Sequence, residues 1–79
     1  MATTVNTLQT DFNGLKRLAK EFLDALPTAN IEEADAGFKC FSLAWLHGDF
    51  STLEKLQADI LLQIISKKYM LREIELDER

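Results

Sequence analysis

The apolar residues of the N-terminal third recur at the spacing of one helix face. They stand alternately three and four positions apart, which is the heptad pattern of a helical seam. Leu18 and Leu23 widen this seam, so we expect apolar neighbours on more than one side. Pro27 pushes the preceding residue out of the helical region, which predicts a helix over about 4–26. The seam consists of Val5, Leu8, Phe12, Leu15, Ala19, Phe22 and Leu26.

A second helix is predicted over about 31–47. Asn30 followed three positions later by Glu33 is a variant of the capping box, which marks the start of a helix. The same three-and-four spacing then continues into an aromatic stripe. Aromatic side chains are common both in cores and as anchors of binding interfaces, so the pattern leaves open whether this stripe is core or interface. The stripe consists of Phe38, Phe41 and Trp45.

The His-Gly-Asp stretch at 47–49 is the one place where side chains typical of reactive sites stand together. A metal would require further ligands that the sequence does not supply, and acid–base catalysis would require a cleft. Gly48 fits the position after a helix end, where a left-handed backbone favours glycine. Ser51 and Glu54 then form a second capping box. We therefore interpret this stretch as a turn before a third helix over about 51–75.

The third helix carries two apolar stripes. One stripe comprises Leu53, Leu56, Ile60, Ile64, Leu71 and Ile74, with Lys67 interrupting it, and the other comprises Leu61, Ile65 and Tyr69. Beyond this helix, the mostly charged tail 76–79 is expected to fray. Short connections make neighbouring helices antiparallel. The sequence therefore predicts an all-α fold, either a three-helix antiparallel bundle or an extended helical hairpin, in a single domain of residues 1–79.

Size and charge limit the classes of function. A chain of 79 residues buries only roughly 60% of its unfolded surface, so docking on a partner would complete a marginal core. The net charge is −4 and no face is strongly basic, which excludes nucleic acid as an expected partner. The one basic cluster, Lys67, Lys68 and Arg72, is interpreted as a solvated helix side. Neither a membrane span nor a signal peptide is recognisable, so we expect a cytoplasmic protein.

The single cysteine gives neither a disulfide framework nor zinc-ligand spacing. Cys40 lies inside a helical pattern and is expected to be a small buried hydrophobe. With the turn at 47–49 interpreted as structural, we expect no enzymatic activity, no cofactor and no metal.

Part of the chain resembles one tetratricopeptide-type helical pair. The resemblance covers Phe38–Ile60, about one repeat, and Leu53 stands where that repeat usually has a small residue. It implies two antiparallel helices joined by a short turn. The residues at the turn and packing positions are Phe41, Gly48, Asp49, Phe50, Leu53 and Ile60.

The chain also resembles the small α-helical proteins of the type III secretion apparatus, namely needle and inner-rod subunits and their co-chaperones. The likeness lies in size, in two long helices, in the break after "LDALP" at 23–27, and in "LEKLQADILLQIISKKYMLREI" at 53–74. The last segment is similar to the terminal helix of rod and needle subunits, which carries assembly contacts. A needle subunit would be a simple hairpin, so three helices favour a co-chaperone or accessory role.

These observations predict a non-enzymatic protein–protein binding module, foremost a small helical co-chaperone or assembly factor of a secretion apparatus. The alternatives are a phage- or plasmid-type small regulator that inhibits a host protein, and a structural filament or rod subunit. In each case the partner is another protein, bound through apolar helix faces in a homo- or hetero-oligomer. The expected partner-binding residues are Phe12, Phe22, Trp45, Leu53, Leu56, Ile60, Ile64 and Leu71.

Overall fold

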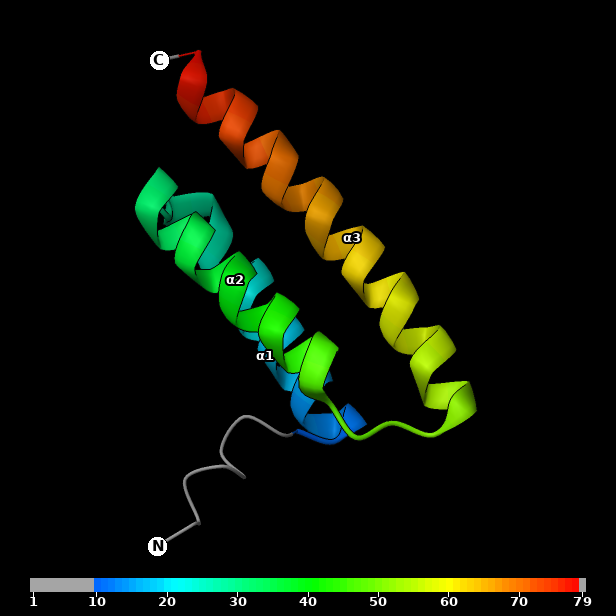
Figure 1. The fold of residues 1–79 in the computed structure, drawn as a ribbon. Helices are drawn as coiled ribbons and strands as arrows, with labels where there is room; N and C mark the ends of the chain where they lie inside the picture. The colour runs from blue at the N-terminus through cyan, green and yellow to red at the C-terminus, as the bar shows by residue number, and fades with distance from the viewer. Residues whose placement is uncertain (1–9, 79) are drawn as a thin grey trace, which may run out of the picture.

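A computed structural model describes residues 10–78 and confirms the all-α fold. Its elements are α1 (Phe12–Ala25), the single 3-10 turn η2 (Leu26–Thr28), α2 (Ile31–His47) and α3 (Thr52–Asp77). Short connections reverse the chain twice, so α1 and α3 run in the same direction and α2 runs opposite to both (Figure 1). Within 10–78 there is no strand.

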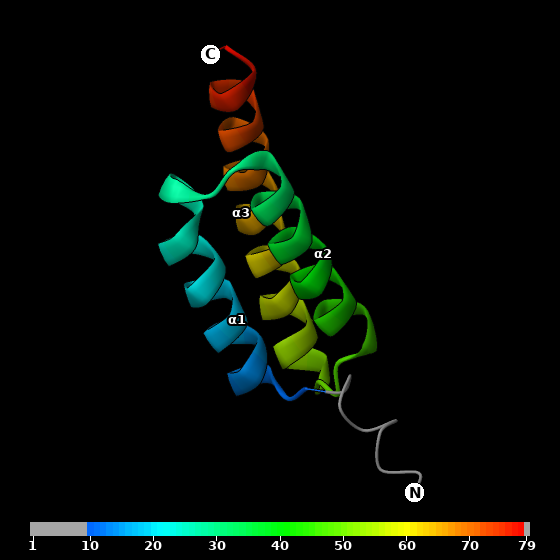
Figure 2. The ribbon, with the colours of Figure 1, turned by 90° about the vertical axis from the view of Figure 1, so that its left-hand side faces the viewer.

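The three helices form two layers. In Figure 2, α1 and α2 lie side by side in front and α3 lies behind them, in contact with both. With 26 residues, α3 is the longest helix, and its C-terminal end rises beyond the other two (Figure 1). The α1–α2 layer therefore covers one side of α3 and leaves the opposite side of that helix outside the bundle.

The core lies between the two layers, where the predicted seam of α1 faces inward. Leu15 is completely buried, and Phe41 of α2 and Ile65 of α3 are the other large side chains with almost no exposed surface. The inward orientation of the seam is confirmed for its members in α1 and η2; Val5 and Leu8 lie outside the described residues. The buried seam residues are Leu15, Ala19, Phe22 and Leu26.

The first helix begins at Phe12, so residues 10 and 11, which the predicted helix over 4–26 includes, are not helical. Asp11 has extended backbone angles and is the N-cap, since its side chain accepts a hydrogen bond from the Gly14 N–H at 2.8 Å. A capping aspartate satisfies one of the amide donors that a helix start leaves unpaired. The predicted residues 4–9 of this helix lie outside the described range.

Both predicted capping boxes are present. The Glu33 N–H donates to Asn30 Oδ1 at 2.8 Å, and the Asn30 N–H donates to the Glu33 carboxylate at 2.9 Å. Ser51 and Glu54 exchange the equivalent bonds at 3.2 and 3.0 Å. At its other end α3 continues to Asp77, so residues 76 and 77 are helical where fraying was expected. Neither glycine nor proline interrupts this end, and good helix formers such as Glu and Leu propagate the helix.

The turn between α2 and α3 differs from the expectation in its backbone. Gly48 is extended, with φ −69° and ψ 156°, and is not left-handed. Glycine leaves room there for the Phe50 ring, because a Cβ atom would meet the end of that ring. The turn also holds the start of the described chain, since the Asp49 N–H donates to the Thr10 carbonyl oxygen at 2.9 Å. The 47–49 stretch thus connects α2, α3 and the segment before α1 through backbone and packing contacts.

Candidate protein-binding face

The side of α3 that faces away from α1 and α2 carries a row of large apolar side chains, which Lys67 interrupts. Each of them leaves between 43% and 66% of its surface exposed. Soluble monomers seldom expose a large apolar patch unless it binds something. We call this row the outer face of α3; it consists of Leu53, Leu56, Ile60, Ile64, Met70, Leu71 and Ile74.

The outer face is left uncovered because another apolar stripe of α3 packs against the core. Ala58 and Ile65 are completely buried, and Leu61, Leu62 and Tyr69 are half-buried against the α1–α2 layer. We call these five residues the inner face of α3. Successive helical residues point about 100° apart, so two stripes on one helix cannot both face the same layer.

The aromatic stripe of α2 faces the inner face of α3. Phe41 is 1% exposed, and the ring of Phe38 stacks on Tyr69 with centroids 4.6 Å apart and planes 3° from parallel. Trp45 is half-buried, and the ammonium of Lys55 lies 3.7 Å from the centre of its ring. The question left open by the sequence is thereby answered: this stripe packs within the bundle.

Two hydrogen bonds between α2 and α3 fix the rotation of α3. Trp45 Nε1 donates to Asp59 at 3.2 Å, and the Tyr69 hydroxyl donates to Asp35 at 3.1 Å. Both pairs are part-buried, where a polar group without its partner is costly. Any rotation that turned the outer face inward would break both bonds and unstack Tyr69 from Phe38.

The same contacts shift the ionisation of two groups. A hydrogen bond from Lys39 and then the one from Tyr69 lower the pKa of Asp35 below 3.8. Desolvation and then the hydrogen bond to Asp35 raise the pKa of Tyr69 from 10.0 to about 12. At neutral pH Tyr69 is therefore a protonated donor and Asp35 a charged acceptor, which is the combination that gives stronger hydrogen bonds.

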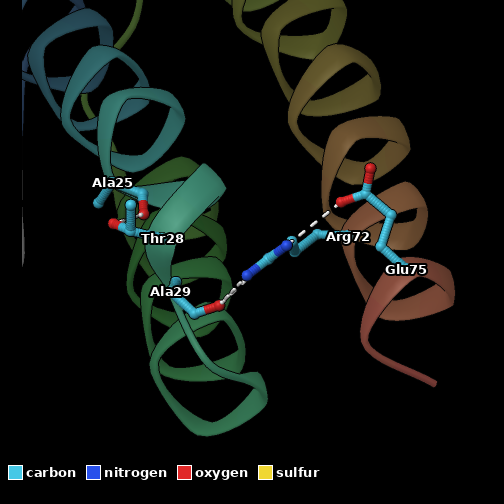
Figure 3. A network of polar contacts seen from close by, with 5 residues as sticks. All are labelled: Ala25, Thr28, Ala29, Arg72 and Glu75. Carbon is cyan, nitrogen blue, oxygen red and sulfur yellow. Dashed lines mark hydrogen bonds and ion pairs between the residues drawn. The ribbon is translucent and has the colours of Figure 1, made fainter. Parts of the chain in front are cut away.

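Arg72 corrects the interpretation of the basic cluster. Arg72 is buried, with 8% of its surface exposed, whereas Lys67 and Lys68 are exposed as expected. Figure 3 shows the guanidinium reaching from α3 to the segment after η2, where Nε and Nη2 donate to the Ala29 carbonyl at 3.2 and 2.9 Å. Nη1 contacts Glu75 at 3.3 Å. The Ala29 carbonyl, just before α2, accepts these hydrogen bonds. They connect the C-terminal half of α3 to the α1–α2 layer.

Five of the eight predicted binding residues lie together on the outer face: Leu53, Leu56, Ile60, Ile64 and Leu71.

The three predicted aromatic contacts lie elsewhere in the bundle. Phe12 is half-buried and meets Phe50 edge-on at 6.4 Å, Phe22 is 8% exposed in the core, and Trp45 packs against α3. Their apolar surface is used inside the chain. Two residues of the outer face are not among the predicted binding residues. Ile74 belongs to the predicted stripe, and Met70 lies beside that stripe but outside its three-and-four spacing.

A groove of about 400 Å³ lies between α1 and α2. Phe22 and Phe41 contribute to its lining, and Gly37 lets the helices approach, because a Cβ there would lie 2.9 Å from Phe22 Cδ1. Cys40 is exposed at this groove, so the expectation of a buried cysteine is wrong. The seam of α2 points toward α3, which leaves residue 40 on another side of the helix. Glu21 also lines the groove.

The part of the chain that the structure describes holds no cluster of metal-binding side chains. No three His, Cys, Asp or Glu residues there are grouped to hold a metal ion. His47 is exposed at the last position of α2, where its ring lies near the negative end of the helix dipole. None of the helices within 10–78 is long and apolar enough to cross a membrane.

Comparison with known proteins adds no relative: neither a protein-family model, nor a curated protein, nor a solved structure matches the chain.

Proposed function

We propose that this protein is a non-enzymatic protein–protein binding module that docks through the outer face of α3. The observation that supports the proposal is the row of seven large apolar side chains, each more than 40% exposed, on a helix whose inner face already completes a core. The bundle does not need these side chains for its own packing. These side chains therefore remain free to be buried by a partner.

The energy of burying the outer face is of the size that binding requires. Fully burying one large aliphatic side chain contributes about 1.5–3 kcal/mol, so covering seven half-exposed ones contributes about 5–10 kcal/mol. Association costs about 4–15 kcal/mol in lost freedom of motion. The face therefore needs a partner that brings an apolar surface of its own.

A protein surface suits this face better than a lipid surface. Helices that lie on membranes carry lysine and arginine along their polar side. Around the outer face the exposed polar residues are of mixed kind, with Lys67 and Lys68 but also Glu75, Gln57 and Gln63. Nothing in this arrangement selects an anionic membrane.

Among proteins of this class, we propose a co-chaperone or assembly factor before a filament subunit. A filament needs two complementary surfaces on each copy, so that every copy binds one neighbour on each side. The outer face of α3 is one surface on one side of the molecule, which a single partner covers. The resemblance of 53–74 to assembly helices of the type III secretion apparatus supports the same role. The alternative of a small inhibitor of a host protein uses the same face.

Site-specific photo-cross-linking tests the proposal. A photoreactive phenylalanine analogue at Ile60, 56% exposed in the outer face, should give protein adducts in the source cells upon irradiation. The matched control places the analogue at Arg17, an exposed position of α1. Adducts at position 60 that are no more abundant than those at position 17 would overturn the proposed function.

A further inference from the structure

We propose that the partner of the outer face is a second copy of this chain, paired antiparallel along α3. This inference rests on the proposed function and names its partner. The energy of burying one outer face alone does not exceed the upper range of the cost of association. A second copy contributes the same seven side chains and doubles the apolar burial. Between Leu53 and Ile74 the face extends about 32 Å, at 1.5 Å per residue.

The spacing of the apolar residues along the outer face lets two copies of α3 match each other when they run antiparallel. Leu53 and Leu56 at one end are three positions apart, as are Leu71 and Ile74 at the other end. When two α3 helices run antiparallel with Ile64 near the twofold axis, Leu53 of one copy lies opposite Ile74 of the other. Leu56 then lies opposite Leu71, and each of these matches occurs twice.

The shape of the face agrees with this register. A shallow hollow of about 550 Å³ lies beside the C-terminal half of α3. It is lined by Met70, Leu71 and Ile74 of the outer face, by Leu62 of the inner face, and by Gln63, Ser66 and Lys67. In the antiparallel register Leu56 of the second copy meets this hollow. Insertion of a large side chain into a hole between helical neighbours is how paired helices pack.

Charge along α3 favours the antiparallel direction over the parallel one. Lys67, the one charged residue within the stripe, would face its own counterpart in a parallel pair. In the antiparallel pair it lies opposite Ile60 of the second copy. The acidic C-terminal turns, with Glu75 and Asp77, then lie beside the positive N-terminal end of the partner helix instead of beside each other.

The approach of a second copy does not disturb the bundle. Figure 1 shows α3 at one side of the molecule, with α1 and α2 on the other. The contacts that fix α3, from Trp45, Tyr69 and Arg72, all point toward the α1–α2 layer. Two copies can therefore pair through α3 as rigid bodies.

Sedimentation equilibrium of the full chain tests the pairing. We expect a concentration-dependent monomer–dimer equilibrium, and a dissociation constant raised at least 100-fold by Ile60→Asp with unchanged helical circular dichroism. Leu46→Asp is the matched control, because Leu46 is an exposed leucine of α2, 63% exposed, outside the outer face. A wild-type chain that stays monomeric, or an equal loss of dimer in both variants, would overturn the proposal.

Disulfide trapping in a Cys40→Ala background tests the direction. Ile64→Cys should form a dimer with itself, and Leu53→Cys should link to Ile74→Cys when the two variants are mixed. Self-linked Leu53→Cys dimers that form as fast as the Ile64→Cys dimers would show a parallel pair and overturn the antiparallel arrangement.

The photo-cross-linking experiment separates failure of this inference from failure of the proposed function. A monomeric chain that still gives adducts with a different protein at Ile60 refutes self-pairing and retains the binding function. A monomeric chain without specific adducts at Ile60 refutes both.

Discussion

The inner and outer faces of α3 are built from the same kinds of residue and do different things. Ile65 is completely buried, whereas its neighbour Ile64 is 43% exposed, although the two side chains are chemically identical. The difference comes from what lies opposite each face. The inner face meets the aromatic stripe of α2 and the seam of α1, while nothing in residues 10–78 covers the outer face. Apolar content alone therefore does not distinguish a core stripe from a binding stripe.

Replacing the two isoleucines separately gives the largest expected contrast between the faces. Ile65→Ala removes buried methyl groups and leaves a cavity, so it should lower the free energy of unfolding by about 2–5 kcal/mol. Ile64→Ala should change the stability of the monomer by no more than about 0.5 kcal/mol, as exposed positions do. Urea unfolding followed by circular dichroism at several protein concentrations measures both effects.

Concentration distinguishes the two losses. The loss in Ile65→Ala should be the same at every concentration, whereas any loss in Ile64→Ala should appear only where the chain associates. Equal, concentration-independent losses would show that α3 is not rotated as described.

Removing the arginine that ties α3 to the other layer should have the next largest effect. Arg72→Met keeps much of the side-chain volume but leaves the Ala29 carbonyl without its donors. An unpaired buried polar group costs about 1–3 kcal/mol, so the free energy of unfolding should fall by that amount. Thermal or urea unfolding beside the exposed-site control Lys68→Met checks it. A loss no larger than that of the control would contradict the role given to Arg72.

The smallest expected effect concerns the hydrogen bond between Tyr69 and Asp35. Since folding raises the pKa of Tyr69 from 10.0 to about 12, its contribution is present below pH 10 and lost as the pH rises to about 12. Tyr69→Phe keeps the ring that stacks on Phe38 and should weaken this alkaline decline. The raised pKa of Lys20, held by Asp24, leaves some decline in both proteins. Identical unfolding profiles between pH 8 and 11 would contradict the prediction.

Helix number, order and capping were predictable because they depend on local chemistry. The side chains of Asn30 and Ser51 satisfy amide groups within the next turn, so short stretches of sequence identify the starts of α2 and α3. The start of α1 was missed because the apolar seam continues upstream of Asp11, and a periodic pattern does not itself mark where a helix begins. The role of Gly48 depends on the Phe50 ring, which a backbone rule for glycine does not include.

The division of α3 into two faces was only half predictable. The sequence separates the stripes of Ile64 and Ile65, but their assignment to partner and core depends on contacts between distant residues. Phe38 stacks on Tyr69, and Arg72 bonds to Ala29, at sequence separations that periodicity does not relate. For the same reason Phe22 was assigned to the interface although it packs in the core.

We propose that the outer face of α3 is open in the monomer and covered in the complex, while the inner face is always covered. Methyl signals of Ile64 and Ile65 in the presence of a soluble paramagnetic agent measure this directly. In dilute protein the agent should broaden the Ile64 signal and spare that of Ile65, and at high concentration Ile64 should become protected as the chains pair. Equal broadening of both signals, or an Ile64 signal that stays exposed at every concentration, would contradict the account.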